Sequence, residues 1–260
     1  MIPFAVVFAM TVSFLATTLV PIVLLIVLGI KKKVALAPLG MGFASFFVSQ
    51  LLLRTPILNV LSQQNWWSGF ASQTIVYYIF LALTAALFEE SARLGGAMLL
   101  KEHRGYWDAL SFGMGHAFCE IFLIYSMTLL NNLLFCYMLN LDGLEATSAL
   151  LPADQAQLVI DQFTAIQPSE VFAGLMERVS TVFFHLFATI LVFQGVVQRR
   201  YWYTLYAIAA HIFFNVVAAF ISLWVDLWIA EFVLLVLGVA GLIYVIMQRK
   251  NSAFPDRHAV

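Results

Sequence analysis

The feature that most constrains this chain is a series of apolar runs, each more than 20 residues long, repeated along its 260 residues. About 20 apolar residues is the length that an α-helix needs to cross the hydrocarbon core of a bilayer. Hydrophobic residues make up 63% of the chain and charged residues only 10%, which excludes a soluble globular domain. The sequence therefore predicts an all-α, polytopic membrane helix bundle that forms a single integral membrane domain over residues 1–260.

Seven spans are expected, and the distribution of basic residues orients them. Of the 13 Lys and Arg, ten fall on one side of this arrangement, two lie within spans, and Arg54 lies on the other side. The positive-inside rule makes the basic side cytoplasmic, so the N-terminus is expected outside and the C-terminus in the cytoplasm. The spans are expected at about residues 4–30, 34–53, 75–100, 109–137, 171–196, 202–224 and 227–247. Arg54 is expected to open an outer connection that runs to Ser72.

The longest connection, residues 139–170, contains five acidic residues and no Lys or Arg, so it is expected to be extracytoplasmic. Within it, Pro152 to Ile166 has helix-start chemistry and spaced apolar residues, which predicts a short helix lying on the membrane surface. The chain shows no phosphate loop, dinucleotide fingerprint or basic nucleic-acid patch. We therefore expect a multi-pass protein of a cell membrane, bacterial inner or plasma membrane, with lipid as a partner and no nucleic acid.

The third span carries charges that lipid should oppose, namely Glu89, Glu90 and Arg93. Near the centre of a helix each charge costs roughly 2.5–3.5 kcal/mol, so three would cost about 8–10 kcal/mol before pairing. Arg93 follows Glu89 by four residues and Glu90 by three, on the same side of the helix as both. One glutamate can therefore neutralise Arg93, and Glu90 with Arg93 is interpreted as a supporting pair, which leaves Glu89 to face another group.

Polar residues on four consecutive spans reach a similar depth. Counted from the cytoplasmic end of their own spans, Glu90, His116 and His211 lie about 7–11 residues deep, or roughly 10–17 Å at 1.5 Å per residue. Neighbours four apart share a helix face, as His116 does with Glu120 and His211 with Asn215. Convergence at one depth predicts a shared site. The supporting polar residues are Glu177, Arg178 and His185. Glycines at 95, 96, 113 and 115 are expected to let spans three and four approach closely.

These residue types suit hydrolysis of a peptide bond. Such a reaction needs an activated water, a stabiliser for the developing oxyanion, and exclusion of bulk water. Glu89 could act as the general base beside His116, His211 and Asn215 without a metal. Alternatively, His116, His185, His211 and Glu89 could hold Zn²⁺ with an open coordination position. The spacing alone leaves both alternatives open.

Three motifs in this order resemble the CAAX-protease and bacteriocin-processing superfamily of intramembrane proteases. They are Glu89-Glu90-x-x-Arg93, Phe112-x-x-x-His116 and His211-x-x-x-Asn215, spread over about residues 75–220, which would then be the catalytic core. Further residues resemble the YhfC-type branch of that superfamily: Gly115-His116-x-x-x-Glu120, Glu177-Arg178 and His185.

The resemblance implies roles for these residues and a class of substrate. Glu89 matches the water-activating glutamate, and Glu90 with Arg93 matches its supporting pair. His116, His211 and Asn215 match the residues that hold the water and the oxyanion. CAAX-processing enzymes have three residues between the second glutamate and the arginine, whereas this chain has two, which argues against prenyl-cysteine processing. The implied activity is peptide-bond hydrolysis of a membrane-associated peptide or protein.

Two other classes of function fit buried charges in a membrane. A transporter or channel could use them as a proton or ion path, but such proteins often show inverted repeats and paired broken helices, which this sequence lacks. A non-catalytic scaffold that binds lipidated peptides is the third alternative.

Overall fold

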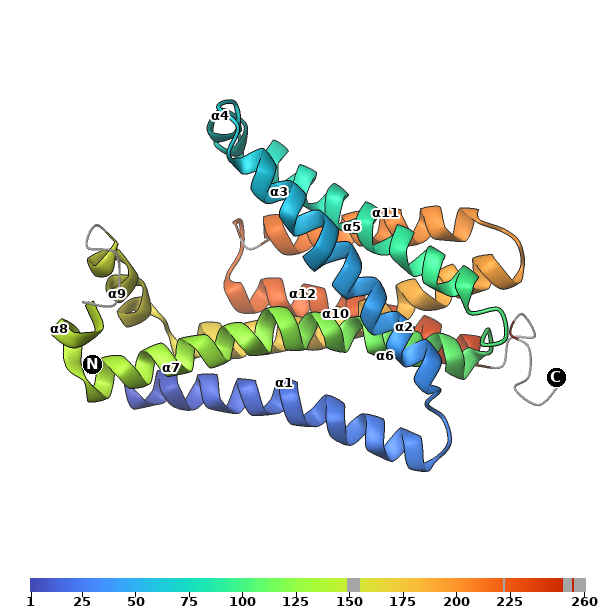
Figure 1. The fold of residues 1–260 in the computed structure, drawn as a ribbon, viewed down its shortest axis with the longest axis horizontal. Helices are drawn as coiled ribbons and strands as arrows, with labels where there is room; N and C mark the ends of the chain where they lie inside the picture. The colour runs from blue at the N-terminus through green and yellow to red at the C-terminus, as the bar shows by residue number, and fades with distance from the viewer. Residues whose placement is uncertain (149–154, 222, 250–253, 255–260) are drawn as a thin grey trace. The chain divides into compact units, whose positions relative to one another are not determined.

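The computed structural model of the chain describes residues 1–148, 155–221, 223–249 and 254 (Figure 1). Regular structure within these residues is helical throughout, without a strand. Seven helical segments are long and apolar enough to cross a membrane, which confirms the all-α prediction with seven spans. They are Phe4–Ile30, Leu36–Ser62, Thr74–Leu99, Tyr106–Leu141, Pro168–Val197, Trp202–Ile221 and Leu227–Gln248.

Two of the spans are composite helices with a π-helical middle. In a π-helix each backbone N–H bonds five residues back rather than four, a geometry that often occurs at functional sites. The elements in chain order are α1 (Phe4–Ile30), α2 (Leu36–Phe46), η1 (Phe47–Arg54), α3 (Thr55–Ser62), α4 (Trp67–Ala71), α5 (Thr74–Leu99), α6 (Tyr106–Glu120), η2 (Ile121–Ser126), α7 (Met127–Leu141), α8 (Gly143–Ser148), α9 (Ala156–Ala165), α10 (Pro168–Val197), α11 (Trp202–Ile221) and α12 (Leu227–Gln248).

The second span runs further than the sequence predicted. Arg54 does not open an outer connection but ends η1, and the helix continues through α3 to Ser62. The physical reason is that neutral acceptors satisfy its guanidinium group within the protein. Arg54 donates to Thr84 Oγ1 at 3.1 Å, to Gln50 Oε1 at 3.1 Å and to the Leu81 carbonyl oxygen at 2.9 Å. A charge whose donors are satisfied in this way need not leave the helix for water.

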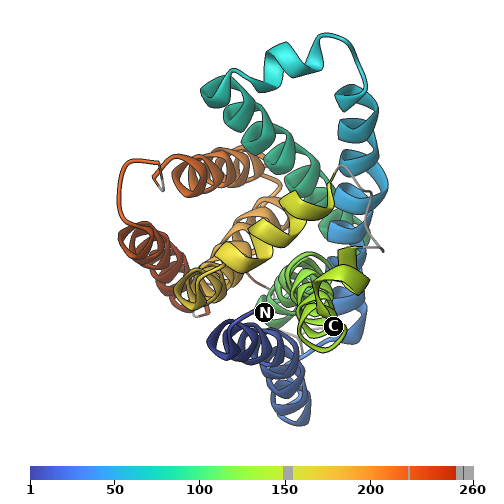
Figure 2. The same ribbon diagram turned by 90° about the vertical axis from the view of Figure 1, so that its left-hand side faces the viewer.

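The chain forms two compact units, Met1–Leu24 with Ile121–Arg178, and Leu25–Glu120 with Val179–Val260. In the first unit the start of α1 packs along α7 (Figures 1 and 2). Asn140 caps the chain start by accepting from the Ile2 N–H at 2.7 Å and donating to the Ile2 carbonyl oxygen at 3.1 Å. Buried apolar side chains such as Met10 and Leu133 then fill the space between the two helices.

The predicted short helix of the long connection is present as α9, Ala156–Ala165, in the first unit. The first residues predicted for it, 152–154, lie outside the described part of the chain. Ile160 is buried, and the ring of Phe163 lies 4.4 Å from that of Phe135 in α7. Part of the apolar face that we assigned to the membrane surface therefore packs on protein, while Leu158 remains exposed.

In the second unit, α2 packs on α6 so closely that two glycines are required. A Cβ added to Gly42 would lie 1.9 Å from the Phe112 carbonyl oxygen, and one added to Gly115 would lie 2.0 Å from the Leu39 carbonyl oxygen. Both contacts are far inside van der Waals distance. Gly115 thus allows the fourth span to approach the second span closely, rather than the third span as we predicted. Gly96 does serve the contact between the third and fourth spans, since its Cβ would meet the Phe112 ring at 2.8 Å.

The remaining predicted glycines divide between a second helix contact and open space. Gly113 faces α10, where an added Cβ would lie 3.1 Å from Thr189, and Gly95 has no neighbour within 4 Å. The second unit also pairs α11 with α5 and with α12. Figure 2 shows α3 and α5 joined through α4 at one end of the unit. The second half of α10 supplies much of the apolar core, from Phe184 to Val196.

Candidate metal centre

The charged residues of α5 lie on its buried side. Glu89 is 5% exposed, and Glu90 and Arg93 are fully buried. Arg93 Nε lies 3.2 Å from Glu90 Oε2, which forms the predicted neutral pair. The same guanidinium group also donates to the His185 carbonyl oxygen at 2.8 Å and to Thr189 Oγ1 at 2.7 Å. The ion pair therefore also ties α5 to α10.

His116 is oriented by a serine from α2. Ser45 Oγ donates its single proton to the Gly42 carbonyl oxygen at 2.7 Å and lies 2.9 Å from His116 Nδ1. Because that hydroxyl proton is already used, His116 Nδ1 must carry a proton and donate to Ser45. In the neutral imidazole, His116 Nε2 then presents a lone pair. This nitrogen lies 3.1 Å from Glu89 Oε2.

His211 is oriented by Glu90, which follows Glu89 on α5. Its Nδ1 lies 2.9 Å from Glu90 Oε1, and an ionised carboxylate only accepts, so Nδ1–H is the donor. In the neutral imidazole, His211 Nε2 then presents a lone pair, 3.9 Å from Glu89 Oε2. Imidazole nitrogens from α6 and α11 therefore face the same carboxylate oxygen of α5.

His185 of α10 has both of its nitrogens engaged. Arg93 has only donors, so its contact at 3.1 Å makes His185 Nδ1 the acceptor. His185 Nε2 must then donate, and it lies 2.7 Å from Glu120 Oε2. The His185 ring lies 5.0 Å from the ring of His116 and 5.6 Å from that of His211, measured between centroids. Glu120 is thus linked to the cluster by its hydrogen bond with His185.

The structure brings together most of the residues predicted for the site. One cluster at the meeting point of α5, α6, α10 and α11, buried except for the partly exposed Glu120, contains Glu89, Glu90, Arg93, His116, Glu120, His185 and His211. Asn215 lies one turn after His211 and is half-buried, and its side chain makes no hydrogen bond within the described residues. Glu177 and Arg178 belong to the first unit, where they pair with each other.

Sequence reasoning missed two residues that hold the cluster in place, Ser45 and Thr189. Ser45 lies in an apolar helix rich in small residues, and Thr189 in a long apolar run, so neither has a distinguishing local pattern. Their roles depend on partners 71 and 96 residues away in sequence. The backbone offers a further sign of the site, because η1 begins two residues after Ser45 and η2 begins directly after Glu120.

The cluster offers nitrogen and oxygen atoms of the kinds that hold a divalent metal ion. One ligand atom each from Glu89, His116 and His185 lie within 4.8 Å of one another. Zn²⁺ favours imidazole nitrogen and carboxylate oxygen at about 2.0–2.2 Å, so ligand atoms about 3–4 Å apart can share it. Metal-binding histidines usually donate their other N–H to a carboxylate or another acceptor. His211 with Glu90 and His116 with Ser45 both meet this requirement.

Fold and site together define a class of protein: a multi-pass helical membrane protein whose spans enclose a buried carboxylate and imidazole cluster suited to a catalytic metal. The chain belongs to the YhfC intramembrane metalloprotease family, which it matches over residues 16–234. It is 30% identical over 203 residues to the "Uncharacterized membrane protein YhfC" of Bacillus subtilis (strain 168), which covers 77% of this chain and 79% of that protein. No solved structure matches the chain. The YhfC-type resemblance and the multi-pass membrane localisation are thereby confirmed.

Proposed function

We propose that this protein is a metal-dependent intramembrane peptidase that hydrolyses a peptide bond in a membrane-associated peptide or protein. The observation that carries the proposal is the environment of Glu89. This carboxylate is 5% exposed, and among the described residues no Lys or Arg lies within 4.0 Å of it. Its Oε2 instead faces the Nε2 atoms of His116 and His211. An anion that faces two lone pairs in a buried site is stabilised by a cation placed among them.

Hydrogen bonding selects which residues would hold the ion. His116 and His211 each have Nδ1–H anchored and Nε2 available, as a metal ligand requires. His185 lies within the same short distances, but both of its nitrogens are engaged by Arg93 and Glu120. We therefore assign His116 and His211 as the imidazole ligands and His185 as a supporting residue. A bound Zn²⁺ would polarise the carbonyl group of the substrate and activate a water molecule.

The protein's own groups would perform the remaining steps. Glu89 accepts the proton of the attacking water, because Glu90 is already paired with Arg93 and Glu120 already accepts from His185. Glu90 keeps the proton on His211 Nδ1, and Ser45 keeps that on His116 Nδ1. The free amide of Asn215 is a donor available to the developing oxyanion. Burial of the cluster excludes bulk water.

Metal analysis and cleavage assays on the same purified variants would test this proposal. We expect the wild-type protein to retain about one Zn²⁺ per chain and to cleave a single-span test peptide. His116→Ala and His211→Ala should lose both the metal and the cleavage, whereas Glu89→Gln should retain the metal and lose the cleavage. His103→Ala is the matched control, because this histidine is 45% exposed and lies outside the cluster. It should change neither quantity.

Several results would contradict the proposal. Full cleavage by Glu89→Gln would remove the assigned base. Loss of metal from His185→Ala but not from His211→Ala would show that His185, rather than His211, is a metal ligand. Ion or proton flux through proteoliposomes that His211→Ala abolishes, with no peptide product, would favour the transporter alternative.

A further inference from the structure

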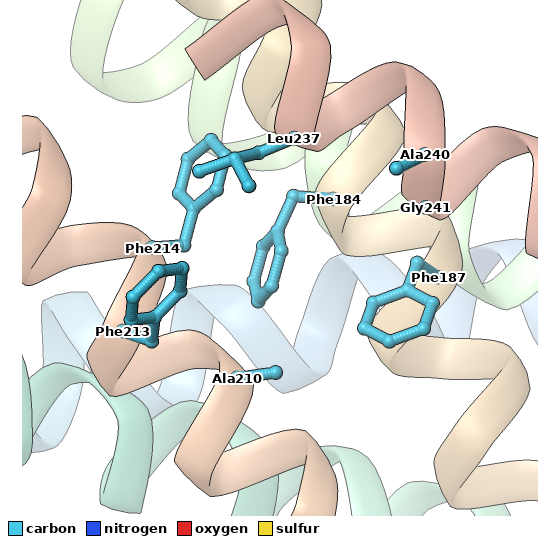
Figure 3. Close-up of a pocket in the computed structure, with 8 residues that line it drawn as sticks. All are labelled: Phe184, Phe187, Ala210, Phe213, Phe214, Leu237, Ala240 and Gly241. Atoms are coloured by element: carbon cyan, nitrogen blue, oxygen red, sulfur yellow. The ribbon is translucent and has the colours of Figure 1, made fainter. Parts of the chain in front are cut away.

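An apolar pocket lies in the second unit between α10, α11 and α12. One of its lining residues, Phe184, contacts the rings of His185 and His211. The pocket has a volume of about 250 Å³. Figure 3 shows the ring of Phe184 in its centre, with Phe213 and Phe214 on one side and Phe187 on the other. Its remaining lining residues are Ala210, Leu237, Ala240 and Gly241. No ionisable side chain lines it, so it can recognise only an apolar group.

The inner wall of the pocket contacts the candidate metal centre. The Phe184 ring lies 5.1 Å from the ring of His211 and 5.6 Å from that of His185, measured between centroids. It also stacks on Phe214 at 4.7 Å. An extended peptide advances about 3.3–3.6 Å per residue, so a side chain in the pocket would belong to a residue within about two positions of a group held at His211.

The pocket opens at the surface of the unit. Small residues in its lining leave space inside it. Phe213 is 57% exposed, whereas Phe184 is 6% exposed, so the lining passes from the exposed face of α11 to the buried wall. Three lining positions, Ala210, Ala240 and Gly241, leave room that larger side chains would fill. An added Cβ at Gly241 would already lie 3.1 Å from Phe187.

The size of the pocket distinguishes between two apolar occupants. Its 250 Å³ exceeds the roughly 150 Å³ of a cavity that holds benzene. A sphere of that volume is about 8 Å across, whereas one leaflet of bilayer hydrocarbon is about 15 Å thick. The space therefore suits one large side chain better than the acyl chain of a lipid.

We propose that this pocket is a specificity subsite that holds one large apolar side chain of the substrate, Leu or Phe, within about two residues of the bond to be cut. This inference rests on the proposed peptidase function and names the feature of the substrate that the same site selects. Substrates that carry a small side chain at that position would leave the pocket unfilled and would gain no binding free energy from it.

Filling the pocket from two different helices would test the subsite. The probes are Lys-flanked single-span peptides that differ only at one guest position, which is Leu, Phe or Ala. The metal-loaded full-length protein should cut next to guest Leu or Phe with a kcat/KM at least about ten-fold above that for guest Ala, the discrimination typical of an apolar pocket. Ala210→Leu and Ala240→Leu should remove this preference by lowering kcat/KM for guest Leu and guest Phe to the value for guest Ala. Ala209→Leu is the matched control because Ala209 is exposed and does not line the pocket.

A second measurement separates failure of the subsite from failure of the peptidase proposal. A guest photo-leucine peptide should cross-link to Phe213 or Leu237 in Glu89→Gln protein, and Ala240→Leu should abolish the cross-link. If wild-type protein cuts no peptide yet this cross-link forms, the peptidase proposal fails and the pocket stands. If both filled variants keep the wild-type preference, or if a photoactivatable phosphatidylcholine labels these residues and the peptide does not displace it, the subsite proposal is overturned.

Discussion

Removing the positive charge of the Glu90–Arg93 pair should strongly destabilise the protein. In an Arg93→Met variant the Glu90 carboxylate stays fully buried without its partner. Breaking a buried ion pair on one side costs about 3–5 kcal/mol, because the remaining charge is uncompensated. The lost donors to the His185 carbonyl oxygen and to Thr189 add little, since Thr189 Oγ1 still donates to that same carbonyl at 2.7 Å. Glu90→Gln should cost a similar amount, because it leaves Arg93 unpaired.

The double variant Glu90→Gln/Arg93→Met should be more stable than either single variant. It leaves no buried charge unpaired, and its cost should be about 1–3 kcal/mol, because it loses the hydrogen bonds of Arg93 to His185 and Thr189 at about 1 kcal/mol or less each. The coupling free energy of the cycle should therefore exceed about 3 kcal/mol. Equilibrium unfolding in mixed micelles of a nonionic detergent and SDS, followed by circular dichroism, measures all four proteins.

A matched pair of exposed residues controls for the chemical changes themselves. Lys101→Met and Glu102→Gln alter the same kinds of group at exposed positions, and each should change the free energy of unfolding by less than about 0.5 kcal/mol. Additive costs for Glu90→Gln and Arg93→Met would refute the reasoning, because they would show that the two charges do not depend on each other.

Three further predictions concern a close helix contact, the orientation of the His116 ring and the orientation of the chain in the membrane. Gly115→Ala should destabilise the protein by about 1–3 kcal/mol or more, because its Cβ would lie 2.0 Å from a backbone oxygen of α2, whereas Gly95→Ala, with open space, should be neutral in the same unfolding assay. Ser45→Ala should weaken metal affinity about 10–100-fold in a chelator competition, because it removes the acceptor that fixes the imidazole of α6, and unchanged affinity would contradict that role. For the predicted orientation, Lys32→Cys should react with an impermeant thiol reagent only in inside-out vesicles and Gln64→Cys only in right-side-out vesicles, and the reverse pattern would invert the topology.

The seven spans could be predicted because run length and composition alone determine them. The end of the second span could not, because Arg54 was interpreted as a residue that needs water. Its guanidinium group is satisfied instead by acceptors 27 and 30 residues away, on α5, together with Gln50 one turn before it. The sequence shows that a charged group is present, but not which distant neutral groups accept its hydrogen bonds.

The contacts made by the glycines show the same limit for helix neighbours. Small residues predict a close helix approach, and Gly115 makes one, but its partner is α2 rather than α5. The period of a helix defines which residues share a face, whereas the identity of the facing helix depends on the whole bundle.

The candidate site was predictable to the extent that depth and spacing determine it. The common depth of the polar residues predicted that Glu89, His116 and His211 would meet, and their side chains do lie together. The tautomers could not be predicted, because they depend on Ser45 for one ring and on Glu90 for the other. A sequence lists groups that can donate or accept, and only their contacts decide which nitrogen keeps its proton.

The Glu90–Arg93 pair therefore does more than neutralise charge in lipid. Each member also contacts a different imidazole, Glu90 that of His211 and Arg93 that of His185. In the Glu90→Gln/Arg93→Met protein the amide oxygen of Gln can still accept from His211, but Met leaves His185 Nδ1 without a donor. His185 can then adopt its other tautomer and lose its bond to Glu120. If the pair orients as well as neutralises, this variant should recover stability but not cleavage activity, because stability depends on net charge whereas activity depends on where each proton lies.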